Sequence, residues 1–243
     1  MSFLVPNWKV PPHVKAVAST RQGGFSTNEY LGLNLGTHVG DDADLVARNR
    51  VQLVELAQMP SAPVWLNQTH STKVAEVFAP SIEILDADGV YTSATGVVCS
   101  AMTADCLPVL LTDSKGTQVA AVHAGWRGLA NGIVENAVEK FSGEVIAWLG
   151  PAIGPNAFEV GEDVLNAFTD FDAQAIDAFQ PTGQHGKWWA NMDKLATQRL
   201  NKLGVTQVFT SGLCTYSDPE RFYSYRRDGV TGRQATFIWL ESR

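Results

Sequence analysis

Short strand-like stretches recur along the chain, and they constrain its fold more than any other feature of the sequence. Each stretch is rich in branched or aromatic residues and is bounded by Gly, Pro or polar turn residues, as is typical of β-strands. Because single short strands are not stable in water, these stretches must pair in sheets. We expect strands at residues 15–19, 64–66, 73–78, 97–102, 109–112, 118–122, 145–149, 205–210, 222–225 and 235–240.

Helical periodicity is confined to fewer and longer segments. In these segments apolar residues recur every three or four positions, which brings them to one face of a helix. The segment that ends at residue 203 is followed by Gly204, a typical residue for a helix end. We expect helices at residues 44–58, 129–141, 163–179 and 191–203.

The order of strands and helices predicts the architecture. The polar segment 114–117 lies between two strand-like stretches and predicts a hairpin. The chain has 243 residues, 45% of them hydrophobic, which is enough for a sizeable core. Neither a repeat nor a low-complexity linker divides it. We therefore expect an α+β fold, a layered single domain over residues 1–243 with mixed β-sheets covered by helices.

Charge and cysteine content restrict the partners and the compartment. Lys and Arg number 18 against 25 Asp and Glu, a net charge of −7, and no basic tract favours nucleic acid or an anionic membrane. No apolar run has the length of a membrane helix, and the proline-containing segment 1–12 lacks the pattern of a signal peptide. Three cysteines, an odd number, favour reduced thiols. We expect a cytoplasmic protein, and the oligomeric state stays open.

Three separate segments each offer one side chain suited to Zn2+. His123 ends an apolar strand, Cys106 precedes the other strand of the same expected hairpin, and His70 lies between two earlier strands. Two imidazoles and a thiolate leave one position of a tetrahedral zinc open, as in catalytic sites. A buried cysteine is more often a small core residue, so the spacing alone is a weak signal. The pattern nevertheless predicts a metal site.

The residues that follow His123 predict an anion-binding turn. The run 125–128, Gly-Trp-Arg-Gly, joins a strand to a helix that we expect to begin near Gly128. Backbone N–H groups at such a junction and the Arg127 guanidinium suit a phosphate or carboxylate group. The alternative is a plain turn with Arg127 in solvent. We expect Arg127 and Asp105 to be catalytic, Arg127 by holding phosphate and Asp105 by carrying a proton.

Further polar segments are expected at the rim of the same cleft. The glycine-rich segments 19–26 and 33–42 have too few apolar residues for core strands and are expected to be loops. The segment 223–228 combines aromatic rings and guanidiniums that can stack on a flat heterocycle, although an exposed edge strand explains it nearly as well. We expect substrate contacts from Arg21, Asn34, Arg50, Gly125, Gly128, Tyr225 and Arg226.

Taken together, the motifs resemble those of the YfiH or laccase-domain family. The resemblance implies a layered α+β fold, related in outline to a group of Cys/His deamidases. It also implies a zinc-containing purine nucleoside phosphorylase that splits adenosine, inosine and methylthioadenosine with phosphate and can deaminate adenosine. The family's metal ligands fall on His70, Cys106 and His123. The matching runs are residues 19–21, 33–36, 103–109, 121–128, 150–154 and 222–232.

Three other functions fit part of the pattern. The family name also records a copper-dependent polyphenol oxidase, and Cu2+ can occupy such a site in vitro, but five histidines without a His-x-His pair cannot build a trinuclear cluster. A Cys/His hydrolase would use Cys106 as its nucleophile, His123 or His70 as base and Asp105 to orient the base. A zinc-stabilised binding module would close the metal's coordination sphere with Cys214.

Overall fold

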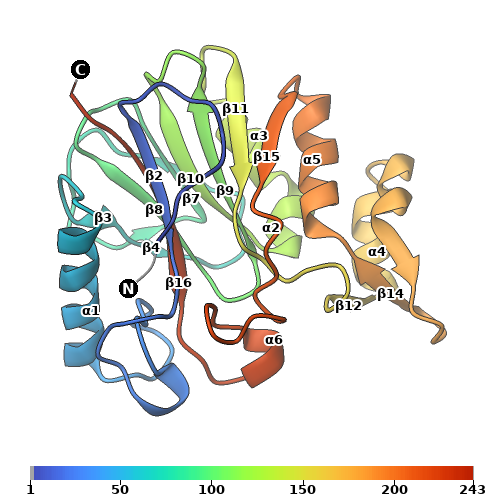
Figure 1. The fold of residues 1–243 in the computed structure, drawn as a ribbon. Coiled ribbons are helices and arrows are strands. Elements are labelled where there is room, and N and C mark those ends of the chain that lie inside the picture. The colour runs from blue at the N-terminus through green and yellow to red at the C-terminus, as the bar shows by residue number, and fades with distance from the viewer. Residues whose placement is uncertain (1–2, 243) are drawn as a thin grey trace.

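The computed structural model describes residues 3–242 and contains a mixed α/β domain of layered sheets and helices (Figure 1). A five-stranded sheet has the order β1-β2-β16-β8-β3, and only β3 runs parallel to its neighbour. Its strands are β1 (Phe3–Leu4), β2 (Val14–Ser19), β16 (Gln234–Leu240), β8 (Val98–Thr103) and β3 (Pro63–Val64). The ends of the domain expected at 1–243, residues 1–2 and 243, lie outside the described residues.

A six-stranded sheet packs against the first and has the order β15-β11-β9-β10-β7-β5. The outer pairs β11–β15 and β5–β7 are parallel, and the inner pairs are antiparallel. Strands β9 and β10 form the hairpin predicted from segment 114–117. The strands are β15 (Gln207–Thr210), β11 (Val145–Leu149), β9 (Leu107–Asp113), β10 (Val119–Ala124), β7 (Gly89–Thr92) and β5 (Val74–Glu76).

Side chains alternate along β9 and β10 between two parts of the core. Leu110 and Ala121 lie with Ile238 of the five-stranded sheet, whereas Leu111 and Val122 lie with residues of the helices. This is the two-residue period that a strand imposes. Every residue of both strands is buried. A side chain at the end of either strand is therefore carried by backbone that is packed on both faces.

Helices cover the outer faces of the two sheets (Figure 1). On the five-stranded sheet, Leu53 of α1 packs with Phe237, while Leu129 and Ile133 of α2 and α3 pack on the six-stranded sheet. No described helix has the length and apolarity needed to cross a membrane. The helices are α1 (Ala43–Leu56), α2 (Trp126–Asn131), α3 (Ile133–Val138), α4 (Glu162–Thr169), α5 (Met192–Lys202) and α6 (Tyr225–Asp228), with 3-10 turns η1 (Asn28–Tyr30) and η2 (Ala173–Ala178).

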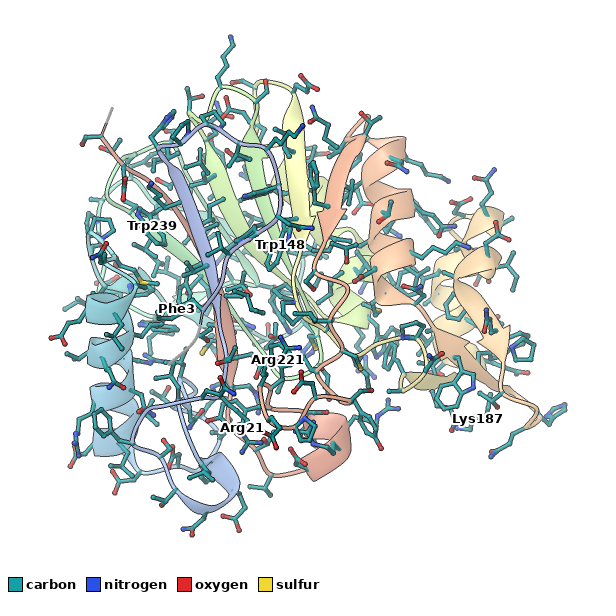
Figure 2. The ribbon with its side chains drawn as sticks, viewed as in Figure 1. Phe3, Arg21, Trp148, Lys187, Arg221 and Trp239 are labelled. Atoms are coloured by element: carbon teal, nitrogen blue, oxygen red, sulfur yellow. The ribbon has the colours of Figure 1, made fainter. Side chains whose placement is uncertain are left out.

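A small three-stranded sheet lies at the periphery beside α4, and Lys187 marks its outer end in Figure 2. Its strands are β12 (Glu159–Gly161), β14 (Lys187–Ala190) and β13 (Phe179–Pro181), and a separate pair is formed by β4 (Leu66–Asn67) and β6 (Leu85–Asp86). The small sheet and β7 are not among the predicted strands, because their three or four residues each give too little periodicity.

The expected α+β architecture is confirmed, and the local differences have physical causes. The helix expected at 129–141 begins earlier, at Trp126, and is divided by Gly132, whose φ of 102° ends α2. The helix expected at 163–179 is α4 followed by η2. The strand expected at 222–225 is wrong, because Ser224 accepts a hydrogen bond from the Arg227 N–H and starts helix α6.

Candidate metal centre

The β9–β10 hairpin brings Cys106 and His123 to the same end of the six-stranded sheet. Strand β9 begins directly after Cys106, and His123 is paired with Pro108 across the hairpin. His123 follows Ala121 at a spacing of two, so its ring lies on the face directed toward the five-stranded sheet. His123 is buried and Cys106 half-buried. The sequence prediction that these two residues face one another is confirmed.

His70 reaches the hairpin from the loop between β4 and β5. Two hydrogen bonds attach this loop to β8, because the Gln68 amide donates to the Met102 carbonyl (2.7 Å) and accepts from the Met102 N–H (2.9 Å). The His70 Nε2 lies 3.7 Å from the Cys106 Sγ, and the His70 and His123 ring centroids are 4.9 Å apart. The folded chain thus joins three residues that are far apart in sequence.

The three side chains fit a metal ion. One ligand atom from each of His70, Cys106 and His123 lies within 4.8 Å of the other two, and two nitrogens with one sulfur suit Zn2+. Gly125 forms the adjoining wall. A Cβ atom there would lie 2.4 Å from the His70 Cδ2 and 3.2 Å from the Cys106 Sγ, so only glycine leaves the three side chains in position.

Asp88, which was not among the predicted site residues, holds the His123 imidazole and the backbone around His70. It is fully buried, and its Oδ1 lies 2.8 Å from the His123 Nδ1, which leaves the other ring nitrogen of His123 for a metal. The same carboxylate accepts hydrogen bonds from the backbone N–H groups of Thr69, His70 and Ser71 at 2.7–3.1 Å. The one sequence signal was an aspartate directly before an apolar stretch, and that pattern is common.

The electrostatics of the group favour a thiolate. Burial alone would raise the pKa of the Cys106 thiol, but the charge and hydrogen bond of His123, followed by those of His70, lower it to about 6. Burial would lower the pKa of His123, but the Cys106 thiolate and the Asp88 carboxylate raise it to about 9. Hydrogen bonds from His123 and Ser71 hold the pKa of Asp88 well below its usual range, against the effect of burial.

A cleft of about 510 Å³ opens onto these three side chains. His38, Arg127, Tyr225 and Arg233 line it together with the metal-binding residues. Arg127 is exposed, and its guanidinium lies 4.4 Å from the Trp126 ring centroid. His38 and Arg233 were not among the predicted site residues. Arg233 directly precedes strand β16. In the sequence, nothing distinguishes it from an arginine on the surface.

A smaller, mostly apolar slot of about 140 Å³ adjoins this cleft. The two share Ala104, Cys106, Trp126 and Tyr225, and the slot adds Asp105, Ile153, Phe158, Met192 and Arg226. Arg226 donates to the Glu159 carbonyl at 2.9 Å, which fixes its guanidinium at the edge of the slot. Tyr225 and Arg226, two of the residues expected to contact substrate, therefore line this slot, and their contact with substrate stays a prediction.

Three expected contact residues do not line either space, and the expectation is corrected for them. Arg21 donates to the Leu31 and Pro219 carbonyls, and Figure 2 shows it beside Arg221. Asn34 is fully buried in its own loop, where it donates to Asp41 and accepts from the Arg233 N–H. Arg50 donates twice to the Leu35 carbonyl and stacks on Trp65. In each of these three residues, side-chain donors already bind oxygen atoms of the same protein.

The glycine-flanked turn differs from the expectation in one respect. Helix α2 begins at Trp126 with Gly125 as its N-cap residue, so Gly128 lies inside the helix and is buried. A Cβ atom at Gly128 would lie 3.1 Å from the Ser71 carbonyl, which packs α2 against the His70 loop. Because α2 is only six residues long, its dipole is small, and Arg127 is the main positive group of the turn.

Asp105 and Cys214 are engaged elsewhere. The Asp105 carboxylate accepts from the Thr215 hydroxyl (2.6 Å), the Ser224 hydroxyl (2.9 Å) and the Arg226 N–H (2.7 Å), and so it anchors the C-terminal segments beside Cys106. The Cys214 Sγ accepts from the Gly154 N–H at 3.1 Å. Cys214 is not part of the His-Cys-His group, so the structure gives no support to it as a fourth ligand.

Known proteins resemble this chain over nearly its whole length. The chain is 49% identical to the purine nucleoside phosphorylase of Haemophilus influenzae, covering 99% of this chain and 100% of that protein. It is 49% identical to the purine nucleoside phosphorylase YfiH of Escherichia coli K12 over 98% of each. The solved structure of Neisseria meningitidis protein NMB0706 has a TM-score of 0.93 at 43% identity, covering 100% of both chains.

A more distant structure gives the same fold. YfiH of Bacillus licheniformis has a TM-score of 0.88 at 28% identity and covers 94% of this chain and 93% of its own. Residues 15–241 match the family model described as multi-copper polyphenol oxidoreductase laccase. That span contains every residue of the His-Cys-His group and of the cleft that opens onto it. The chain therefore belongs to this laccase-like family, together with the YfiH proteins.

Proposed function

We propose that this chain is a zinc-containing purine nucleoside phosphorylase that acts on adenosine, inosine and methylthioadenosine. The observation that carries the proposal is the shared wall between two unlike spaces, an apolar slot and a cleft with cationic and metal-binding side chains. A nucleoside has an apolar heterocycle joined to a polar sugar, and phosphate must approach that sugar. The names of relatives at 49% identity support the same activity.

The slot suits a purine base. Trp126, Phe158 and Tyr225 offer aromatic surfaces, and Ile153 and Met192 complete an apolar lining. Flat heterocycles gain burial and stacking energy in such a space, and a few polar groups at its edge set their orientation. The Arg226 guanidinium, fixed by the Glu159 carbonyl, supplies that edge.

The cleft suits phosphate. Arg127 has no hydrogen-bonding or charged partner within residues 3–242, and Arg233 lines the same space, with Nη1 bonded to the Thr231 and Gly232 carbonyls. In phosphorolysis a phosphate oxygen forms a bond to the anomeric carbon of the ribose while the bond to the purine nitrogen breaks. Two guanidiniums would hold the phosphate beside that carbon, and positioning supplies much of the rate.

His70, Cys106 and His123 would hold the zinc ion, with Asp88 fixing the His123 imidazole and the backbone of His70. A bound Zn2+ supplies Lewis-acid chemistry and lowers the pKa of a bound water. Deamination of adenosine at this site is part of the proposal, and so is Asp105 as proton carrier. The three donors that surround the Asp105 carboxylate also support a positioning role for it beside Cys106.

The test combines metal analysis with product identification. Purified protein is expected to contain zinc and to convert adenosine to adenine and ribose 1-phosphate only when phosphate is present. Arg127→Ala should raise the KM for phosphate about tenfold, since a charge-assisted contact is lost. Arg48→Ala is the matched control, because Arg48 is exposed on α1 and stacks on Phe25 away from the cleft. Release of the base without phosphate would contradict the proposal.

A Cys/His hydrolase is the second candidate, and the lowered pKa of the Cys106 thiol, about 6, favours it. The hydrolase needs a bare thiolate as nucleophile, whereas the phosphorylase uses the same sulfur as a ligand. Protein that is free of metal as purified, and whose Cys106 becomes acylated during turnover, would establish the hydrolase.

Copper loaded at the site in vitro is expected to support only weak polyphenol oxidation, because one His-Cys-His group is formed within residues 3–242.

A further inference from the structure

A second cleft, of about 590 Å³, lies at the carboxyl ends of the parallel strands β11 and β15. Helix α5 packs beside β15 (Figure 1), and its residues Asp193, Lys194 and Thr197 line the other side of the cleft. In open α/β sheets, ligands bind outside the carboxyl ends of the parallel strands, where loops supply side chains and free backbone groups. The volume lies within the range of small-molecule sites. None of the residues proposed above to bind metal or phosphate lines it.

The walls of this second cleft are partly apolar and carry one unpaired negative charge. Ile153, Val208 and Leu213 give the apolar surface, and Asp193 lies on the first turn of α5. The Asp193 Oδ2 accepts from the Thr210 hydroxyl at 2.5 Å, and no ion pair with Asp193 is formed within residues 3–242. Partial burial of a carboxylate without a cation costs free energy. A cationic ligand that pairs with Asp193 would offset this cost, which favours its binding.

The neighbouring positive groups do not cancel this charge. The Lys194 ammonium donates to the Asp177 carbonyl at 2.7 Å and is held at that contact. The N-terminus of α5 carries only about half an elementary charge, and the full charge of Asp193 on its first turn exceeds it. Burial raises the pKa of Asp193 above its usual value, which fits a carboxyl group that lacks a cation.

We propose that this second cleft binds a small molecule with an amidinium or ammonium group, which pairs with Asp193 while its apolar part lies on Ile153 and Leu213. The site goes beyond the proposed phosphorolysis and does not depend on it. Backbone bonds join the cleft to the metal centre, because the Ala152 carbonyl accepts from the Thr215 N–H and the Ile153 N–H donates to the Asp105 carbonyl, both at 2.9 Å. The two sites are neighbours, and Ile153 lines both the second cleft and the apolar slot.

Cys214 provides the reporter for a test, since it lines the cleft and is half-buried. Benzamidine serves as the probe, and benzamide, its neutral analogue of nearly the same shape, is the control ligand. The rate of alkylation by iodoacetamide is followed for each cysteine by mass spectrometry of its peptide. Cys99 is fully buried and Cys106 lies in the other cleft, so both act as internal controls.

Benzamidine in the millimolar range is expected to slow the alkylation of Cys214 at least about fivefold and saturably, because a charge-assisted pair forms with Asp193. Benzamide should give little protection, and Cys106 should react at an unchanged rate. In Asp193→Asn, which keeps an acceptor for Thr210, the protection by benzamidine should be lost. Asp170→Asn, at an exposed position after α4, is the matched control and should keep it.

Equal protection by benzamidine and benzamide in the unaltered protein would overturn the proposal, because the charge would then play no part. The same holds for an absence of protection up to the solubility of the probe, or for full protection in Asp193→Asn. The comparison of the two probes needs no variant, so it decides the matter even if Asp193→Asn does not fold. Phosphorolysis is not measured, and a failure of the proposed function leaves this test intact.

Discussion

The two sides of the metal centre are built in different ways. Cys106 and His123 stand at the ends of paired, fully buried strands, where the register of the hairpin sets their separation. His70 stands on an exposed loop with a φ of 62°, a left-handed backbone that few residues adopt without support. The hairpin side is held by many backbone bonds, whereas the loop side depends on a few side chains.

Asp88 is the residue that joins these two sides. One carboxylate accepts from the His123 ring and from the backbone on both sides of His70. The loop therefore takes its position from the same group that orients the hairpin histidine. A rigid strand end can therefore position a ligand through local register, whereas a loop ligand needs a buried partner from elsewhere in the chain.

The largest effect is expected on the hairpin side, from Cys106→Ala. Loss of the only sulfur ligand should reduce zinc from about one ion per chain to background and abolish phosphorolysis. Metal analysis and a product assay measure both. At neutral pH the thermal midpoint of the metal-free protein should also fall, because the thiolate that pairs with His123 is lost. A Cys106→Ala protein with full zinc would remove this residue from the site.

A smaller loss is expected from Asp88→Asn, which tests the link between the two sides. The asparagine NH2 group would face at least one of the N–H donors that Asp88 now accepts from, and that hydrogen bond would be lost. The zinc affinity should therefore fall about 10–100-fold, and the free energy of unfolding by about 1–3 kcal/mol. Competition with a chelator and thermal unfolding measure these effects. Asp86→Asn is the matched control, because Asp86 is exposed and, within residues 3–242, its side chain accepts only from the Asn67 amide. Equal zinc affinity in both variants would mean that other contacts hold the loop.

A steric test of the loop side compares Gly125→Ala with Gly128→Ala. The new methyl group at residue 125 would lie 2.4 Å from the His70 Cδ2, so the His70 ring must move and the zinc affinity should fall about tenfold. At residue 128 the nearest atom is the Ser71 carbonyl oxygen at 3.1 Å, which needs only a small backbone adjustment. The ratio of the two zinc affinities is the measurement, and a ratio near one would contradict the wall assigned to Gly125.

The same contrast explains how much the sequence could predict. Cys106 and His123 were accessible because strand periodicity and one short turn fix their relation. His70 was accessible only as a candidate, and Asp88 was missed, because its contacts join segments 17–19 residues before it and 35 residues after it. No local pattern encodes such contacts. The α+β class and the hairpin at 114–117 followed from local periodicity, whereas the order of the strands in the two large sheets and the position of each loop did not.

The rim arginines illustrate a second limit. Arg50 and Arg127 look alike in the sequence, yet Arg50 donates twice to the Leu35 carbonyl while Arg127 is exposed in the cleft. Residue type indicates that a guanidinium can bind an anion. It does not indicate whether the donors are already used by carbonyl groups of the same protein, which depends on how a distant loop closes.

The smallest effect is expected in the titration of Cys106 in zinc-free protein. The thiol pKa of about 6 predicts that alkylation stays fast at pH 7 and slows as the pH falls through 6, whereas an ordinary thiol slows below about 8.5. Because the folded pKa lies below the unfolded one, the stability from this thiolate is present at high pH and is lost as the pH falls through 6.

This titration also separates the two sides of the site. His123 contributes more than His70 to the lowered pKa of Cys106, since its charge acts at the end of the same hairpin. His123→Ala should therefore move the midpoint of alkylation upward further than His70→Ala, which should move it by roughly one pH unit or less. Alkylation rates measured across the pH range in both variants test the order. If His70→Ala gave the larger change, the exposed loop would govern the thiolate, and the hairpin would serve only as its scaffold.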